Sequence, residues 1–132
     1  MTAFADTSAL YAFLDKANRS HELVTQIWDT VSAGGGLLVT TNYTVLETAA
    51  LCQSRFGPPI ARDLFDRVVP GLDVHWVDQE VHEAAVAALL VANRRDLSLV
   101  DCVSFEVMRR LDIRQAFTLD EHFREQGFEV VP

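Results

Sequence analysis

Four acidic residues, far apart along the chain, have the types and positions that a metal centre needs. Asp6 follows the short apolar run Ala3–Ala5, and Asp120 follows the apolar run that ends at Leu119. Glu47 and Asp101 each lie near the start of a segment with helical spacing. Oxygen ligands without histidine favour a hard cation such as Mg²⁺, with Mn²⁺ as a substitute.

Each of these carboxylates also has an ordinary structural explanation. Asp6 and Asp120 have the sequence context of N-cap residues, which accept hydrogen bonds from free backbone N–H groups. Ser98-x-x-Asp101 resembles a capping box, although Glu or Gln is the usual partner. Glu47 stands in apolar sequence and is either half-buried or facing a cleft. Taken singly, the three aspartates favour capping over catalysis.

The elements that must position these residues alternate between strand and helix. Apolar runs predict strands over residues 3–5, 37–39, 72–77, 115–119 and 128–131. Helices are expected over residues 9–14, 20–33, 43–56, from 58 to about 69, 79–93, 98–111 and briefly after 120. This order predicts a single domain, 1–132, folded as a three-layer α/β/α sandwich around a parallel sheet of about five strands.

If the sheet is parallel, helix capping by these aspartates has a further consequence. Helices that follow strands begin at the carboxyl edge of the sheet, and ligands bind in the crevice outside that edge. Capping therefore crowds the carboxylates of Asp6, Asp101 and Asp120 together with Glu47. Such a cluster is tolerable only if it is protonated, spread apart or neutralised by a cation. The sequence predicts that Asp6, Glu47, Asp101 and Asp120 are metal-binding and catalytic, and places Asp96 outside this set.

Composition narrows the class of protein. A net charge of −8, with ten arginines and one lysine, argues against a nucleic-acid coat or an anionic membrane partner. No apolar run approaches the roughly 18 residues of a membrane span, and no secretory leader is visible, so we expect a cytoplasmic protein. Cys52 and Cys102 match no metal-ligand spacing and are expected to be buried free thiols.

Several other enzyme classes are excluded by single positions. His82-Glu83 begins like a zinc-protease helix, but Val86 stands where the second histidine belongs, and the other histidines show no shared ligand spacing. A phosphorylatable receiver needs a lysine late in the chain, and the only lysine is Lys16. A haloacid-dehalogenase-type phosphatase needs a second aspartate where Ser8 stands.

Four segments, in order, resemble the signature segments of PIN-domain proteins. They are AFADTS at 3–8, TNYTVLE at 41–47, LSLVDCVSF at 97–105 and FTLDEHF at 117–123. Within that superfamily, a domain of this length is most similar to the VapC ribonuclease toxins of toxin–antitoxin pairs. The resemblance implies a magnesium-dependent endoribonuclease with Asp6, Glu47, Asp101 and Asp120 as its acidic residues.

The same resemblance implies partners. A homodimer is expected, together with a small antitoxin whose tail occupies the crevice and an RNA substrate. Two alternatives remain open: a housekeeping RNA-processing nuclease, and a non-catalytic PIN module that binds RNA or protein without cutting. All four acidic positions are intact, which favours an enzyme.

Overall fold

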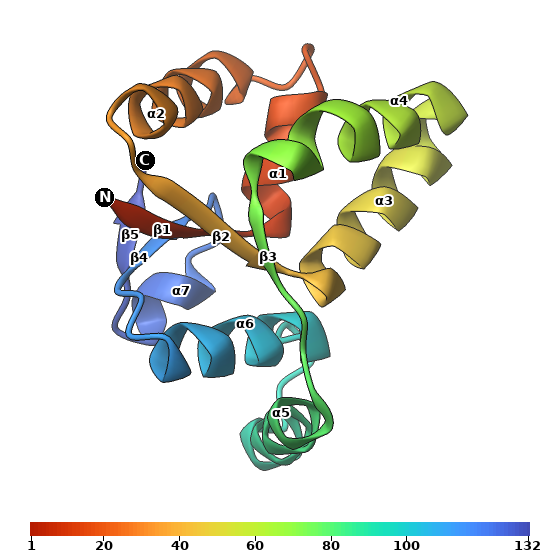
Figure 1. Ribbon diagram of the computed structural model, residues 1–132. Coiled ribbons are helices and arrows are strands. Elements are labelled where there is room, and N and C mark those ends of the chain that lie inside the picture. The colour runs from red at the N-terminus through yellow and green to blue at the C-terminus, as the bar shows by residue number, and fades with distance from the viewer.

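A five-stranded parallel sheet forms the centre of the computed structural model, which describes residues 1–132 (Figure 1). The strand order is β3-β2-β1-β4-β5, and every neighbouring pair is parallel. The strands are β1 (Thr2–Ala5), β2 (Leu37–Thr41), β3 (Asp73–His75), β4 (Gln115–Phe117) and β5 (Glu129–Val131). Because β1 is central and buried on both faces, its sequence is a continuous apolar run rather than an alternating one.

Seven α-helices connect and cover the strands. They are α1 (Thr7–Leu14), α2 (His21–Ala33), α3 (Asn42–Phe56), α4 (Pro58–Asp63), α5 (Gln79–Ala92), α6 (Leu99–Arg110) and α7 (His122–Glu125). After α4 the chain continues through a π-helical turn, Leu64–Val68, and a 3₁₀ turn, Val69–Gly71. None of the helices is both long and apolar enough to span a bilayer.

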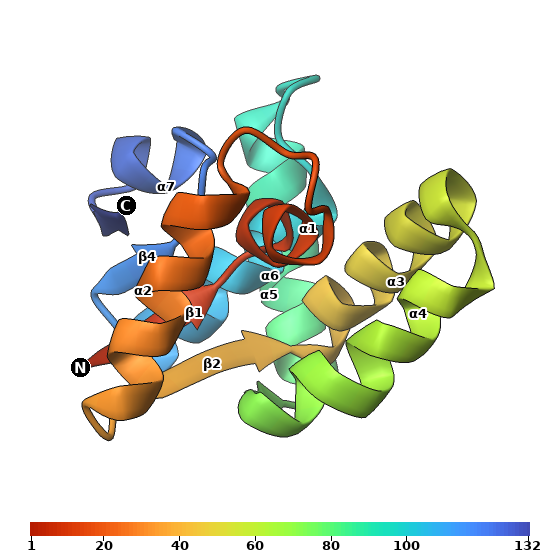
Figure 2. The ribbon, with the colours of Figure 1, turned by 90° about the horizontal axis from the view of Figure 1, so that it is seen from above.

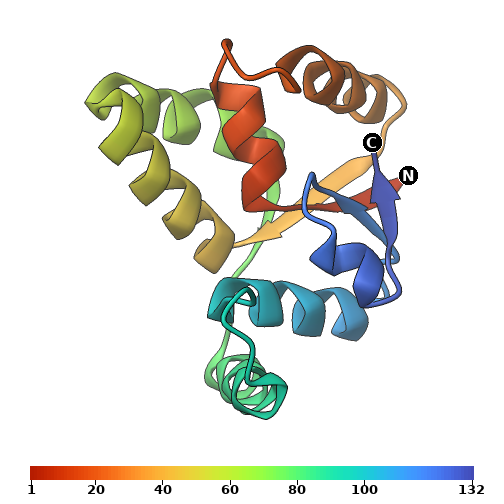
Figure 3. The same cartoon turned by 180° about the vertical axis from the view of Figure 1, so that it is seen from behind.

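Two separate apolar cores hold the layers together, one on each face of the sheet. Ala3 and Ala5 of β1 pack with Leu10 of α1 and Val24 of α2 on one face. Phe4, which points the other way, packs with residues of α5, α6 and α7 on the opposite face. Seen from above, α1 and α2 lie over the sheet, while from behind α6 separates the sheet from α5 (Figures 2 and 3). The predicted three-layer fold is confirmed.

Two strands end earlier than the apolar pattern predicts, and for the same reason. Beyond β3, the backbone N–H of Val77 donates to the side chain of Asn42 at 2.8 Å instead of to a neighbouring strand. Beyond β4, the N–H of Leu119 donates to Ser8 Oγ at 2.9 Å. Side-chain acceptors therefore replace the sheet ladder at its carboxyl edge, where the chain leaves the sheet.

The predicted helix starts are supported by side-chain caps. Asp6 accepts from the backbone of α1, Thr41 from that of α3 and Asp78 from that of α5. Pro58 begins α4, where a missing N–H costs nothing. Cys52 and Cys102 are buried and unpaired, as expected.

Candidate metal centre

The four predicted carboxylates line one crevice at the carboxyl edge of the sheet. Asp6 follows β1, Glu47 lies on α3, Asp101 is in the first turn of α6 and Asp120 follows β4. The crevice has a volume of about 560 Å³. Its remaining lining consists of polar and a few apolar side chains: Thr7, Ser8, Tyr11, Asn18, Leu51, Ser98 and Leu119. The sequence-predicted residues therefore meet in space, while their role as ligands stays a prediction.

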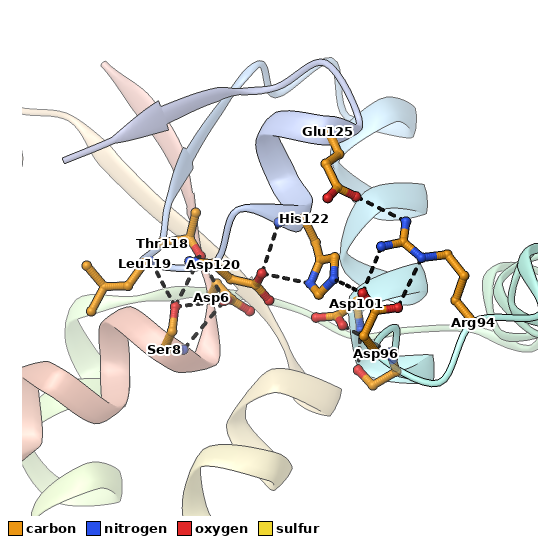
Figure 4. A network of polar contacts seen from close by, with 11 residues as sticks. Asp6, Ser8, Arg94, Asp96, Asp101, Thr118, Leu119, Asp120, His122 and Glu125 are labelled. Atoms are coloured by element: carbon orange, nitrogen blue, oxygen red, sulfur yellow. Dashed lines mark hydrogen bonds and ion pairs between the residues drawn. The ribbon is translucent and has the colours of Figure 1, made fainter.

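Asp6 is the most deeply buried member, with 3% of its surface exposed. Its Oδ2 accepts hydrogen bonds from Ser8 Oγ at 3.0 Å and Thr118 Oγ1 at 2.9 Å (Figure 4). Burial raises the pKa of Asp6 to about 6; the hydrogen bonds from Thr118 and Ser8 oppose this rise, and the charge of Asp101 adds to it. The folded protein thus holds a carboxylate whose ionised form is disfavoured without a cation.

The Asp101 side chain both caps α6 and lines the crevice. Its Oδ2 accepts from the backbone N–H of Ser98 at 3.0 Å, and Ser98 Oγ accepts from the N–H of Asp101 at 3.1 Å, which is a complete capping box. Burial raises the pKa of Asp101, the hydrogen bonds from Ser98 oppose the rise, and the charge of Asp120 adds to it. The capping explanation is therefore correct, and it also brings the carboxylate into the crevice.

A histidine completes a tight group with two of the carboxylates. One ligand atom from each of Asp101, Asp120 and His122 lies within 4.8 Å of the others. The His122 side chain is 18% exposed, and its Nδ1 lies 2.7 Å from Asp120 Oδ1 without an aligned hydrogen bond. Its other nitrogen, Nε2, lies 3.1 Å from Asp96 Oδ2, and this contact raises the pKa of His122, with Asp120 and Asp101 adding to the rise.

The sequence matches a known protein family over most of its length. A family profile described as PIN domain matches residues 3–129. The chain belongs to the PIN-domain family.

The chain is also similar to one named relative and to two solved structures. The PIN domain is 30% identical, over 98% of each chain, to the 23S rRNA-specific endonuclease VapC20 of Mycobacterium tuberculosis. The crystal structure of VapC20, described as a sarcin–ricin loop cleaving toxin, covers the whole chain with a TM-score of 0.88 and 29% identity. FitAcB from Neisseria gonorrhoeae shares the fold, with a TM-score of 0.70 at 13% identity over 100% of this chain and 97% of that one. The resemblance to PIN-domain proteins is confirmed.

Sequence reasoning did not single out His122, and it placed Asp96 outside the site. It compared the histidines only with one another, whereas the partner of His122 is a carboxylate two residues earlier, Asp120. Asp96 does not line the crevice, as expected, but its Oδ2 contacts His122 Nε2 at 3.1 Å (Figure 4). The signal in the sequence was the Asp-x-His spacing at the start of α7, which puts both side chains on one side of a short turn.

The residues of this PIN domain fit a divalent cation. Carboxylate oxygens from Asp6, Asp101 and Asp120 supply the hard ligands that Mg²⁺ or Mn²⁺ takes. Thr7 Oγ1, a buried polar atom of a crevice residue, has no hydrogen-bond partner in the protein. Buried polar groups are nearly always paired, so this atom is available to a further ligand or water.

Proposed function

We propose that this PIN domain is a divalent-metal-dependent endoribonuclease of the toxin–antitoxin type, acting in the cytoplasm on RNA. The observation that carries the proposal is the convergence of four carboxylates from four separate elements on one crevice. The likeness to VapC20 over the whole chain supports a toxin-type ribonuclease. Asp6, Glu47, Asp101 and Asp120 are the residues to which we assign the metal, Mg²⁺ or Mn²⁺.

The chemistry divides between the cation and the chain. A bound divalent cation supplies an activated water and stabilises charge on the phosphoryl oxygens. The chain's own residues hold the ligands in place: Ser8 and Thr118 fix one oxygen of Asp6, and Ser98 fixes one oxygen of Asp101. The positive charge of such a cation would also offset the protein's net charge of −8 where an RNA phosphate approaches.

Chelation tests the proposal directly. Purified protein should cleave RNA in the presence of Mg²⁺ or Mn²⁺, and cleavage should stop in excess EDTA and resume when the metal is restored. The products are followed on denaturing gels, with an Asp101→Asn preparation run in parallel to reveal contaminating nuclease. If wild-type protein cleaves RNA equally well with and without EDTA, and the Asp101→Asn preparation does not cleave, the metal mechanism is ruled out.

The same protein should also associate with itself. Phe13 of α1 and Trp28 of α2 stack with ring centroids 4.6 Å apart and pack against the core, so they are less available for contact with a second copy. A more exposed apolar groove of about 560 Å³ lies along α3 and β3, where Trp76 is 75% exposed and Leu46 is 70% exposed. Exposed apolar surfaces of this kind mark interaction sites.

We expect light scattering to report a dimer at micromolar concentration and above. Trp76→Asp tests whether the groove belongs to the dimer contact, since a side chain this exposed contributes little to the fold of one subunit. A wild-type protein that stays monomeric at high concentration would contradict the dimer.

Co-expression with a small neighbouring gene product should yield a stable complex that no longer cleaves RNA, as expected for an antitoxin whose tail fills the crevice.

A further inference from the structure

We propose that His122 is a direct ligand of the cation, through Nδ1, alongside Asp101 and Asp120, and that this nitrogen makes the centre prefer Mn²⁺ over Mg²⁺. The inference rests on the proposed function and deepens it by assigning a ligand atom and a metal preference. It was not visible in the sequence, where the acidic set supplied oxygen ligands alone.

The position of Nδ1 is the first observation. His122 opens α7, and its ring lies between Asp120 on one side and Asp96 on the other (Figure 4). Nδ1 is inaccessible to solvent and has no aligned hydrogen bond, although Asp120 Oδ1 is only 2.7 Å away. An unprotonated Nδ1 would place its lone pair against a carboxylate oxygen at short range, so this contact requires either a proton on Nδ1 or a metal cation beside both atoms.

The partner of the other ring nitrogen is the second observation. Nε2 contacts Asp96 Oδ2 at 3.1 Å. A histidine that binds a metal almost always donates its second N–H to a carboxylate or carbonyl, which fixes the tautomer and leaves the first nitrogen free for the metal. Asp96, His122 and Asp120 have this arrangement, with Nε2 in contact with Asp96 Oδ2 and Nδ1 facing Asp120 Oδ1.

Asp96 is itself held in place, which is the third observation. Arg94 donates to both of its oxygens, at 3.0 Å and 2.8 Å, and also to Glu125 at 3.0 Å. The Arg94 guanidinium lowers the pKa of Asp96 well below its usual range, with His122 contributing. The two hydrogen bonds from Arg94 hold the Asp96 carboxylate in place beside His122 Nε2.

Ligand chemistry then gives the metal preference. Imidazole nitrogen suits transition metals, whereas Mg²⁺ strongly prefers oxygen and retains its waters. A centre with two carboxylates and one nitrogen should bind Mn²⁺ more tightly than Mg²⁺ through the nitrogen. The ring must be neutral to bind, so a cation at this position replaces any proton on Nδ1. The competing arrangement is a charged ring that bridges Asp96 and Asp120 and never contacts the metal.

Pulsed electron paramagnetic resonance of Mn²⁺-loaded protein separates these arrangements. We expect the wild-type spectrum to contain a coupling to a directly bound ¹⁴N, and we expect His122→Gln to remove it. Calorimetric titration should show Mn²⁺ affinity falling about 10-fold or more in His122→Gln, with a smaller change for Mg²⁺. Asp96→Ala, which leaves the ring but releases its orientation, should weaken Mn²⁺ binding by about 10-fold.

His82→Gln is the matched control, because His82 contacts Tyr43 and lies outside the group formed by Asp101, Asp120 and His122. It should leave the nitrogen coupling and both affinities unchanged. A wild-type spectrum with no bound nitrogen, or a coupling that survives His122→Gln, overturns the inference. If wild-type protein binds Mn²⁺ and cleaves RNA without a nitrogen coupling, only the inference fails. If it neither binds the metal nor cleaves, the proposed function fails instead.

Discussion

Asp101→Asn should lower the rate of metal-dependent RNA cleavage about a thousand-fold or more while leaving the fold intact. Metal ions contribute several kcal/mol of transition-state stabilisation, and each 1.4 kcal/mol is a factor of ten in rate. Asparagine keeps an oxygen that can accept from the Ser98 N–H, so α6 retains its cap. What it removes is the negative charge that a cation needs. Initial rates at saturating Mg²⁺, compared with those of wild-type protein, measure the effect.

A matched control separates the crevice from helix capping. Asp78 caps α5 by accepting from Val81 N at 2.9 Å and lies outside the crevice. Asp78→Asn should retain full activity, since asparagine caps as well as aspartate. If Asp101 acted only as a helix-start residue, the two variants would behave alike, and Asp101→Ala would cost about 0.5–2 kcal/mol with or without metal. Full activity of Asp101→Asn would show that the metal assignment is wrong.

Asp6→Asn should make the metal-free protein more stable at neutral pH, by up to about 3 kcal/mol. The pKa of Asp6 is raised from 3.8 to about 6 in the folded protein, and one pKa unit corresponds to 1.36 kcal/mol. Above pH 4 the unfolded chain loses this proton while the folded chain keeps it. The contribution of Asp6 to the free energy of unfolding therefore falls as pH rises from about 4 to about 6 and is fully lost above pH 7.

Urea unfolding of wild-type and variant protein in EDTA, from pH 4 to pH 8, measures this contribution. The difference between the two curves isolates Asp6, because every other titrating group is common to both. That difference should be smallest near pH 4 and largest above pH 7. Asparagine accepts less strongly from Ser8 and Thr118, so part of the gain is offset. Adding Mg²⁺ should stabilise wild-type protein by mass action and the variant much less. A difference that stays constant with pH would show that ionised Asp6 does not destabilise the folded protein.

Those parts of the molecule that depend on local pattern were predictable from the sequence. Apolar runs ahead of Asp6 and Asp120 located β1 and β4, and the capping chemistry of Ser98 located α6. A parallel sheet then brings helix starts to one edge whatever the loop details, which is why the four carboxylates could be grouped. The ends of β3 and β4 were not predictable, because the side chains of Asn42 and Ser8 that terminate them belong to distant segments.

The contacts of His122 could not be predicted from the sequence for the same reason. The role proposed for it depends on Asp96, which is 26 residues away in sequence and lies in the connection between α5 and α6. No periodicity or capping rule links an exposed loop aspartate to a histidine at the start of α7. The sequence contained both residues, but only the packing of α7 against α6 through Phe123 and Phe105 brings them into contact.

The hydroxyl pair that holds Asp6 also determines when the centre can first exist during synthesis. Ser8 and Thr118 are 110 residues apart, and each both donates to Asp6 and accepts a backbone N–H from the segment after β4. A chain emerging from the ribosome therefore carries Asp6, Glu47 and Asp101 long before it has Thr118, Asp120 or His122. The crevice cannot form, or bind a cation, until β4 has paired with β1. The nuclease activity proposed above therefore requires residues 115–132 to be synthesised and β4 to pair with β1.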